Sequence, residues 1–208
     1  HHVFSDWNRT ELDSYLIEIT AEILDTKDET GAYVLDTILD AAGQKGTGKW
    51  TGINALDEGI PVTLIVEAVF ARSLSALKES RTAASKVLSG PTGTITVPDR
   101  GQFVEDVRLA LLASKIVSYA QGFMLIKAAS EANDWRIDYG NVALLWREGC
   151  IIRSVFLGQI KEAFGKNPDL DNLLLDDYFR GVIEHAQGAW RHVIARAVEA
   201  GIPVPAFS

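Results

Sequence analysis

Lysine and threonine side chains are concentrated in a short glycine-rich stretch, residues 43–50, which reads GQKGTGKW. Lys45 and Lys49 supply positive charge for an anion, and Thr47 supplies a hydroxyl donor. Glycines let backbone N–H groups approach a ligand closely. Together these residue types predict a phosphate or carboxylate site. Composition alone leaves one alternative open, a flexible surface loop that happens to contain lysines.

The same stretch also fits GxxxxGK, the pattern of nucleotide-binding P-loops, from Gly43 to Lys49. That pattern needs serine or threonine after the lysine to hold magnesium, whereas Trp50 follows here. It also needs a strand before the loop. The apolar residues at 34, 35, 38, 39 and 42 have helical spacing instead. Both departures disfavour a P-loop.

The elements that must position these residues are predicted to be helices. Apolar residues recur at helical spacing, no alternating strand run occurs, and no GxGxxG turn follows a strand, so the chain is predicted to be all-α. The segment 89–100, which contains prolines and glycines, is predicted to be a loop. The predicted helices cover residues 9–25, 32–42, 51–57, 61–78, 80–88, 103–133, 141–164 with an offset at Gly149, and 169–200.

Two of these helices have predicted inward faces. The first, capped by Asn8 with Glu11, would place Leu12, Tyr15, Leu16, Ile19 and Ile23 in one apolar stripe. The long helix 103–133 would turn Val104, Val107, Leu111, Ile116 and Phe123 inward.

The helix that begins at Pro61 is apolar on nearly all sides as far as Ala71, which predicts that it is buried. Arg72 follows this run. A guanidinium there reaches water, pairs with an internal carboxylate such as that of Glu67 or Asp57, or binds an anion.

Three landmarks recur in the same order, about 140 residues apart, and predict a diverged internal duplication. They are Trp7 with Trp146, Trp50 with Trp190, and the tetrapeptide GIPV at 59–62 and 201–204. Around Trp190 the lysines, the threonine and two of the glycines are missing. The tryptophan therefore belongs to the repeated scaffold, and the anion-binding residues belong to one copy.

The duplication predicts a single all-helical domain over residues 3–208. Its first repeat covers about 7–78 and its second about 146–208, and the long helix 103–133 links them. In the second copy only five residues follow Gly201-Ile202-Pro203, so we expect the chain to be a piece of a longer protein. His1-His2 is interpreted as a tag remnant and is given no chemistry.

Composition narrows the functional classes. Of 208 residues, 47% are hydrophobic, enough for a substantial core, and the net charge of −8 argues against a general nucleic-acid surface. Cys150 is the single cysteine, so no internal disulfide can form and a reducing, cytoplasmic location is expected. No secretory signal or membrane-spanning run is predicted, because the apolar stretch 60–71 is too short and contains Glu67.

Residues 38–51, ILDAAGQKGTGKWT, resemble the signature of decarboxylating 6-phosphogluconate dehydrogenases. The resemblance extends over essentially the whole chain. It includes WNRTELDSYLIEIT at 7–20, GIPVTLI at 59–65 with EAVFAR at 67–72, and GCIIRS at 149–154.

The resemblance implies an enzyme that oxidises 6-phosphogluconate with NADP, releasing CO2 and ribulose 5-phosphate in the pentose phosphate pathway. It implies a Rossmann domain for NADP followed by a helical, duplicated domain that forms a homodimer. Matched by position, Lys45, Thr47 and Arg72 correspond to residues that bind the substrate phosphate. Lys49 matches the signature without an assigned contact.

Several parts of the family pattern are not matched here. The resemblance implies a catalytic lysine and glutamate, and a tail whose arginine and histidine reach the partner's substrate, and this sequence shows none of them. We therefore expect no catalytic, cofactor-binding or metal-binding residue in this chain, and no activity from it alone. The alternative is a helical dimerisation module without a ligand site.

Overall fold

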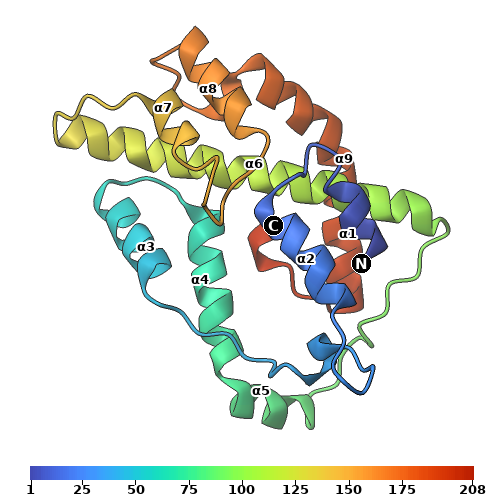
Figure 1. The fold of residues 1–208 in the computed structure, drawn as a ribbon. Helices are drawn as coiled ribbons and strands as arrows, with labels where there is room; N and C mark the ends of the chain where they lie inside the picture. The colour runs from blue at the N-terminus through green and yellow to red at the C-terminus, as the bar shows by residue number, and fades with distance from the viewer. The chain divides into compact units, whose positions relative to one another are not determined.

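The computed structural model describes residues 1–208 and contains helices, loops and two isolated β-bridges, without a β-strand (Figure 1). The all-α prediction is therefore confirmed. In chain order the helices are α1 (His2–Trp7), α2 (Tyr15–Asp25), the 3-10 helix η1 (Val34–Thr37), α3 (Thr47–Asp57), α4 (Thr63–Ala76), α5 (Lys78–Ser85), α6 (Arg100–Ala132), α7 (Tyr139–Leu144), α8 (Leu157–Lys166), η2 (Leu173–Leu175), α9 (Asp177–Ala200) and η3 (Pro205–Phe207).

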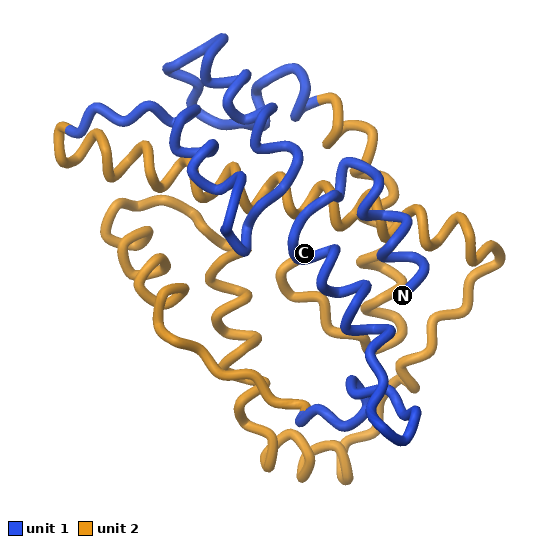
Figure 2. The backbone as a smooth tube through the Cα atoms, viewed as in Figure 1, with its two compact units in different colours: residues 1–39, 135–180 blue, residues 40–134, 181–208 orange.

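The chain divides into two compact units, each built from two separate segments (Figure 2). Unit 1 contains residues 1–39 and 135–180, and unit 2 contains residues 40–134 and 181–208. Each predicted repeat therefore contributes its first half to unit 1 and its second half to unit 2. This equivalent division supports the predicted duplication.

Equivalent positions of the two predicted repeats also have similar local hydrogen bonds. In unit 2, Ile60 N donates to Ala55 O and Ile202 N donates to Ala197 O, each at 2.8 Å. The glycines before these isoleucines both have positive φ, as helix C-caps of this type require. In unit 1, Ser14 and Ser154, at equivalent positions of the two copies, pair with each other in an antiparallel bridge.

Near the Ser14–Ser154 bridge, the structure differs from the predicted first helix. The prediction of one helix over 9–25 was wrong, because residues 8–14 form turns between α1 and α2. The Asn8 side chain accepts a hydrogen bond from Ser14 N at 3.2 Å instead of capping a helix at residue 9, and Tyr15 N donates to Arg153 O. The buried face of α2 is Ile17 and Ala21, whereas Leu16 and Ile23 are exposed.

The second-copy partner of this bridge also interrupts a predicted helix. Residues 141–164 form two short helices, α7 and α8, rather than one helix with an offset at Gly149. Gly149 has a φ of +64°, which is incompatible with a helix at that position, and Val155 N donates to Asp13 O. These contacts hold the intervening segment in turns. The last predicted helix, 169–200, becomes η2 followed by α9.

Helix α6 forms the core of unit 2 together with α9. Leu109 and Ala113 of α6 pack with Ala186 of α9, and Trp190 lies against this cluster. Beside it, Asp106 Oδ2 lies 2.7 Å from Nδ1 of His192. Of the residues predicted to face inward on this helix, Ile116 and Phe123 are buried, but Val104, Val107 and Leu111 are only half-buried.

By length and composition α6 would also be able to cross a membrane, and 44% of its most apolar window is buried inside the protein. Core helices have the same properties. Since α6 packs against α9 and its Asp106 is buried beside His192, we interpret it as a core helix.

The residues of helix α4 are more exposed than predicted. No residue within α4 is fully buried, and Phe70 and Leu74 are 62% and 59% exposed, so the prediction of a buried helix was wrong for this chain. The remaining boundary differences are small, since α5 begins and ends slightly earlier than predicted and residues 86–99 form the predicted loop.

One face of α4 packs closely against α3, with which it lies side by side in Figure 1. A Cβ built on Gly48 would lie 2.7 Å from Cγ2 of Val69, and one built on Gly52 would lie 3.1 Å from Cγ2 of Val66. Gly48 and Gly52 are one helical turn apart and share a face. These two glycines thus permit the close approach of α3 to α4.

We expect Gly48→Ala to destabilise the chain. A β-branched valine has little freedom to move away from the new methyl group, and overpacking costs about 1–3 kcal/mol. Urea unfolding measures the effect. Gly188→Ala in α9 is the matched control, because nothing lies within 4 Å of its added Cβ and alanine favours helices. Gly48→Ala with Val69→Ala should recover stability. Equal effects at both glycines would contradict the proposed contact.

Candidate anion site at the start of helix α3

The glycine-rich stretch is half loop and half helix, and lies entirely in unit 2. The predicted helix 51–57 in fact begins at Thr47, so Lys49 and Trp50 are helical. Gly46 is the N-cap residue with a φ of +101°, a left-handed conformation that side chains disfavour. No side chain caps this helix end. The first-turn N–H groups are therefore left without a capping partner.

The segment before this helix is not the helix predicted over 32–42. Only Val34–Thr37 forms a 3-10 turn, and the chain is irregular from residue 38 to 45. Its backbone groups bond to side chains from elsewhere instead of to each other. Ala42 N donates to Ser75 Oγ at 3.1 Å, and Asp40 O accepts from Arg81 Nη2 at 2.6 Å. Tertiary contacts thus replace the helical ladder here.

Arg72 reaches this irregular segment from α4. Its Nε donates to Gly43 O at 2.7 Å, and its Nη2 donates to the same carbonyl. Arg72 forms no salt bridge with Glu67 or Asp57, the internal partners that the sequence left open. The Arg72 side chain is exposed beside the loop.

Lys45 and Thr47 follow Gly43 within four residues, so the structure brings Arg72 to the segment that contains them. Both side chains are exposed, and neither the Lys45 ammonium nor the Thr47 hydroxyl has a hydrogen-bond partner within the chain. Only the Thr47 carbonyl takes part in a side-chain hydrogen bond, which it accepts from Thr51 Oγ1.

The local charge favours an anion. Lys49 lies in the first turn of α3, and that turn contains no acidic residue. A helix N-terminus carries partial positive charge and is normally stabilised by acidic side chains. Here Lys45, Lys49 and Arg72 add positive charge at the same end. This arrangement is unfavourable without a ligand and becomes favourable when an anion binds.

Asp40, the carboxylate nearest in sequence to the loop, is already engaged. Its Oδ2 accepts from Lys78 Nζ at 3.1 Å and from Arg81 Nη1 at 3.0 Å. These bonds, that of Lys78 first, hold the pKa of Asp40 below its ordinary value. The carboxylate therefore stays ionised with its two cations and does not neutralise Lys45 or Arg72.

The sequence predicted the charged residues of this candidate site but not the groups that hold them in place. These are the carbonyl of Gly43, Ser75, Asp40 and Arg81, which fasten the loop to α4 and α5. The misplaced helix start also hid the uncapped N-terminus of α3. A glycine directly before threonine was the available signal for that start.

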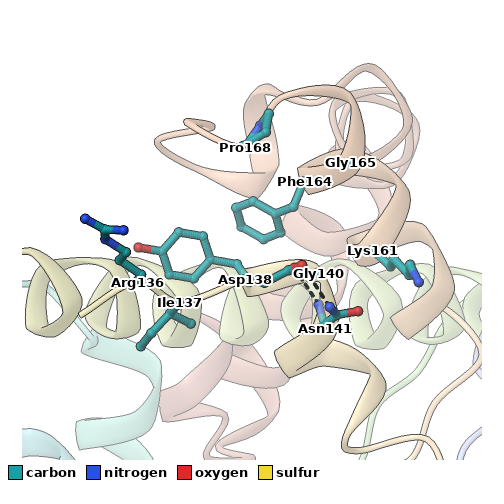
Figure 3. A pocket seen from close by; sticks show the side chains of 10 residues that line it. Arg136, Ile137, Asp138, Gly140, Asn141, Lys161, Phe164, Gly165 and Pro168 are labelled. Carbon is teal, nitrogen blue, oxygen red and sulfur yellow. Dashed lines mark hydrogen bonds between the residues drawn. The ribbon is translucent and has the colours of Figure 1, made fainter.

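A separate pocket of about 610 Å³ lies in unit 1 beside α7 and α8 (Figure 3). Phe164 and Pro168 contribute apolar walls, and Arg136 and Lys161 lie toward opposite ends of the view. Asp138 is occupied in capping α7, because its two carboxylate oxygens accept from Asn141 N and Nδ2. None of the predicted site residues lines this pocket.

Known proteins are similar to this chain over nearly its whole length. The family model described as "6-phosphogluconate dehydrogenase, C-terminal domain" matches residues 1–208. The chain is 58% identical over 205 residues to the human protein named "6-phosphogluconate dehydrogenase, decarboxylating", and 60% identical over 205 residues to the protein of that name from Aggregatibacter actinomycetemcomitans. Each alignment covers 99% of this chain but 42% of the relative.

A solved structure agrees with these sequence matches. Plasmodium falciparum 6-phosphogluconate dehydrogenase, described in its apo form and in complexes with its cofactor NADP+ and its substrate 6-phosphogluconate, superposes with a TM-score of 0.94 at 43% identity. The match covers 99% of this chain and 44% of that chain. By its sequence and by its helical fold, the chain belongs to the 6-phosphogluconate dehydrogenase family and corresponds to its C-terminal domain.

Proposed function

We propose that this chain is the helical part of an NADP-dependent, decarboxylating 6-phosphogluconate dehydrogenase, and that its anion site binds the substrate phosphate. The whole protein would convert 6-phosphogluconate to ribulose 5-phosphate and CO2. The observation that carries the proposal is that Arg72 bonds the carbonyl of Gly43, within four residues of Lys45 and Thr47, beside an uncapped helix start in a chain of this family.

Each of the three residues has a distinct role in this proposal. The Lys45 ammonium would neutralise part of the phosphate dianion, and the Thr47 hydroxyl would donate one hydrogen bond. Arg72, oriented by its bonds to Gly43 O, would present its remaining N–H groups to the phosphate oxygens. The first-turn N–H groups of α3 would add donors. These contacts anchor the end of the substrate away from the carbon that is oxidised.

The cofactor would be held outside this chain. NADP sites of the Rossmann type need parallel strands with a glycine-rich turn, and the residues present form helices instead. They do not fit a dinucleotide. We therefore assign no catalytic, cofactor-binding or metal-binding residue to the 208 residues, and expect the acid–base groups of the reaction elsewhere in the longer protein.

We further propose a homodimer that covers the exposed apolar side of α3 and α4. Trp50, Leu56, Phe70 and Leu74 are all more than half exposed, although α4 is apolar on nearly every side. A groove of about 510 Å³ is lined by Phe70 and Leu74 together with Pro203 and Pro205. Large exposed apolar patches mark interfaces.

We also propose a cytoplasmic protein that binds neither nucleic acid nor membrane. The single cysteine suits a reducing compartment, and the net charge of −8 is unfavourable for a general nucleic-acid surface. The packing of α6 on α9 supports its interpretation as a core helix rather than a membrane span.

Arg72→Ala should abolish phosphate binding while reducing stability only modestly. Charge-assisted hydrogen bonds contribute about 1.5–3 kcal/mol each, and association itself costs several, so we expect a Kd on the order of millimolar for the wild-type chain. Affinity should fall with added salt. An NMR titration with inorganic phosphate or 6-phosphogluconate measures binding, and urea unfolding measures stability.

Lys86→Ala, which removes an exposed positive charge after α5, is the control for a general charge effect. Severe destabilisation by Arg72→Ala with unchanged phosphate binding would contradict the proposed role of Arg72. That result would favour the alternative of a helical dimerisation module.

The homodimer predicts that Phe70→Glu converts the chain to a monomer, because it would bury a charge in an apolar interface. Sedimentation at micromolar concentration measures the assembly. Val198→Glu, at an exposed valine of α9, should leave the dimer intact. A monomeric wild-type chain, or dissociation by both substitutions alike, would argue against an interface on α4.

The isolated chain should not reduce NADP in the presence of 6-phosphogluconate. Without a dinucleotide fold and an acid–base pair the reaction lacks its cofactor site and a proton-transfer contribution of about 10²–10⁴-fold. Absorbance of reduced cofactor measures turnover. A rate above the buffer blank, in material free of host enzyme, would be incompatible with the assignment of all catalytic residues elsewhere.

A further inference from the structure

Arg81 of α5 connects three groups that lie around the anion-binding loop. Its Nη1 donates to Asp40 Oδ2 at 3.0 Å, and its Nη2 donates to Asp40 O at 2.6 Å and to Ser75 O at 3.0 Å. Asp40 lies in the irregular segment that leads to Lys45, and Ser75 lies in the last turn of α4. One guanidinium therefore ties the start of the loop to the helix that carries Arg72.

Ser75 extends this connection along the loop. Its hydroxyl accepts a hydrogen bond from Ala42 N at 3.1 Å, and the next residue, Gly43, is held by Arg72. Residues 40, 42 and 43 are thus each fastened to α4 or α5. The two residues that follow before Gly46 have much weaker attachment, since Gln44 reaches Ser73 at 3.4 Å and Lys45 has no bond.

Burial distinguishes Arg81 from its neighbour Lys78. The Arg81 side chain is 29% exposed, whereas that of Lys78 is 40% exposed and that of Asp40 is 68% exposed. Lys78 makes one bond to the Asp40 carboxylate, but Arg81 also binds two backbone carbonyls. A planar guanidinium can bridge acceptors in different directions, and a lysine ammonium in this position cannot replace all of these bonds.

We propose that Arg81 is a positioning residue for the phosphate site, which holds residues 40–43 on α4 so that Lys45 and Thr47 face the guanidinium of Arg72. This proposal rests on the proposed function. Arg81 touches backbone and Asp40 rather than the ligand, so it acts by keeping the loop ordered before phosphate binds. Its removal should raise the entropy that binding must overcome.

The test compares Arg81→Ala, Arg81→Lys and the control Arg191→Ala, which removes an exposed arginine of α9, in the 208-residue chain. NMR titration with inorganic phosphate gives the Kd. Amide hydrogen exchange of Ala42 reports the loop, and that of Leu112 in α6 reports the core. Because ordering one residue costs about as much as a tenfold change in binding, we expect Arg81→Ala to raise the Kd roughly tenfold.

Arg81→Lys should raise the Kd less, because it retains the charge near Asp40, and Arg191→Ala should leave it unchanged. Ala42 should exchange faster in Arg81→Ala while Leu112 does not. Should Arg81→Ala fail to fold, Arg81→Lys carries the same comparison. Unchanged phosphate binding and Ala42 exchange would overturn the proposal, as would equal acceleration of both amides, which indicates general destabilisation. If the wild-type chain does not bind phosphate, the proposed function fails, whereas Ala42 exchange still decides whether Arg81 holds the loop.

Discussion

The close approach of α3 to α4 is the constraint on which the candidate site depends. Gly48 and Gly52 leave room for Val69 and Val66. The backbones of α3 and α4 therefore lie closer together than a larger side chain at either glycine position would permit. This contact fixes the N-terminus of α3 next to the helix that carries Arg72. The glycines of the signature therefore divide into different roles. Gly43 supplies a carbonyl, Gly46 a left-handed turn and Gly48 a packing surface.

Ion pairing separates the cations of the candidate anion site from the structural ones. Lys78 and Arg81 share the carboxylate of Asp40, which lowers its pKa and neutralises that side of the loop. Lys45 and Lys49 have no such partner and lie beside a helix N-terminus, where positive charge is unfavourable. The protein thus keeps these positive charges at the N-terminus of α3, where the electrostatic interaction is repulsive. An oxyanion would relieve it, and this is the physical basis for interpreting the region as a binding site rather than as a basic surface.

The two units show how the two predicted repeats differ around the candidate site. Each predicted copy is divided at an equivalent point between the units, and both end their second helix with the same glycine cap. The second copy has Trp190 packed near Ala186, with no lysine at the corresponding positions, while Trp50 is 63% exposed in the first copy. The repeated elements thus serve a core function in one copy and leave a surface free in the other.

The sequence by itself determined the all-α class and the family, because helical periodicity and a contiguous signature are local properties. It also supplied the prediction of the candidate site residues. It misplaced the segments whose conformation depends on distant partners. Residues 34–42 have helical spacing, yet Ser75 and Arg81 take up the backbone groups of Ala42 and Asp40. Residues 8–14 and 145–156 are held in turns by the pairing of Ser14 with Ser154. Whether α4 is buried was likewise decided by tertiary structure. Apolar composition indicates that a helix is unfavourable in water without a covering partner. Only the folded chain shows that the rest of its residues leave Phe70 and Leu74 of α4 exposed.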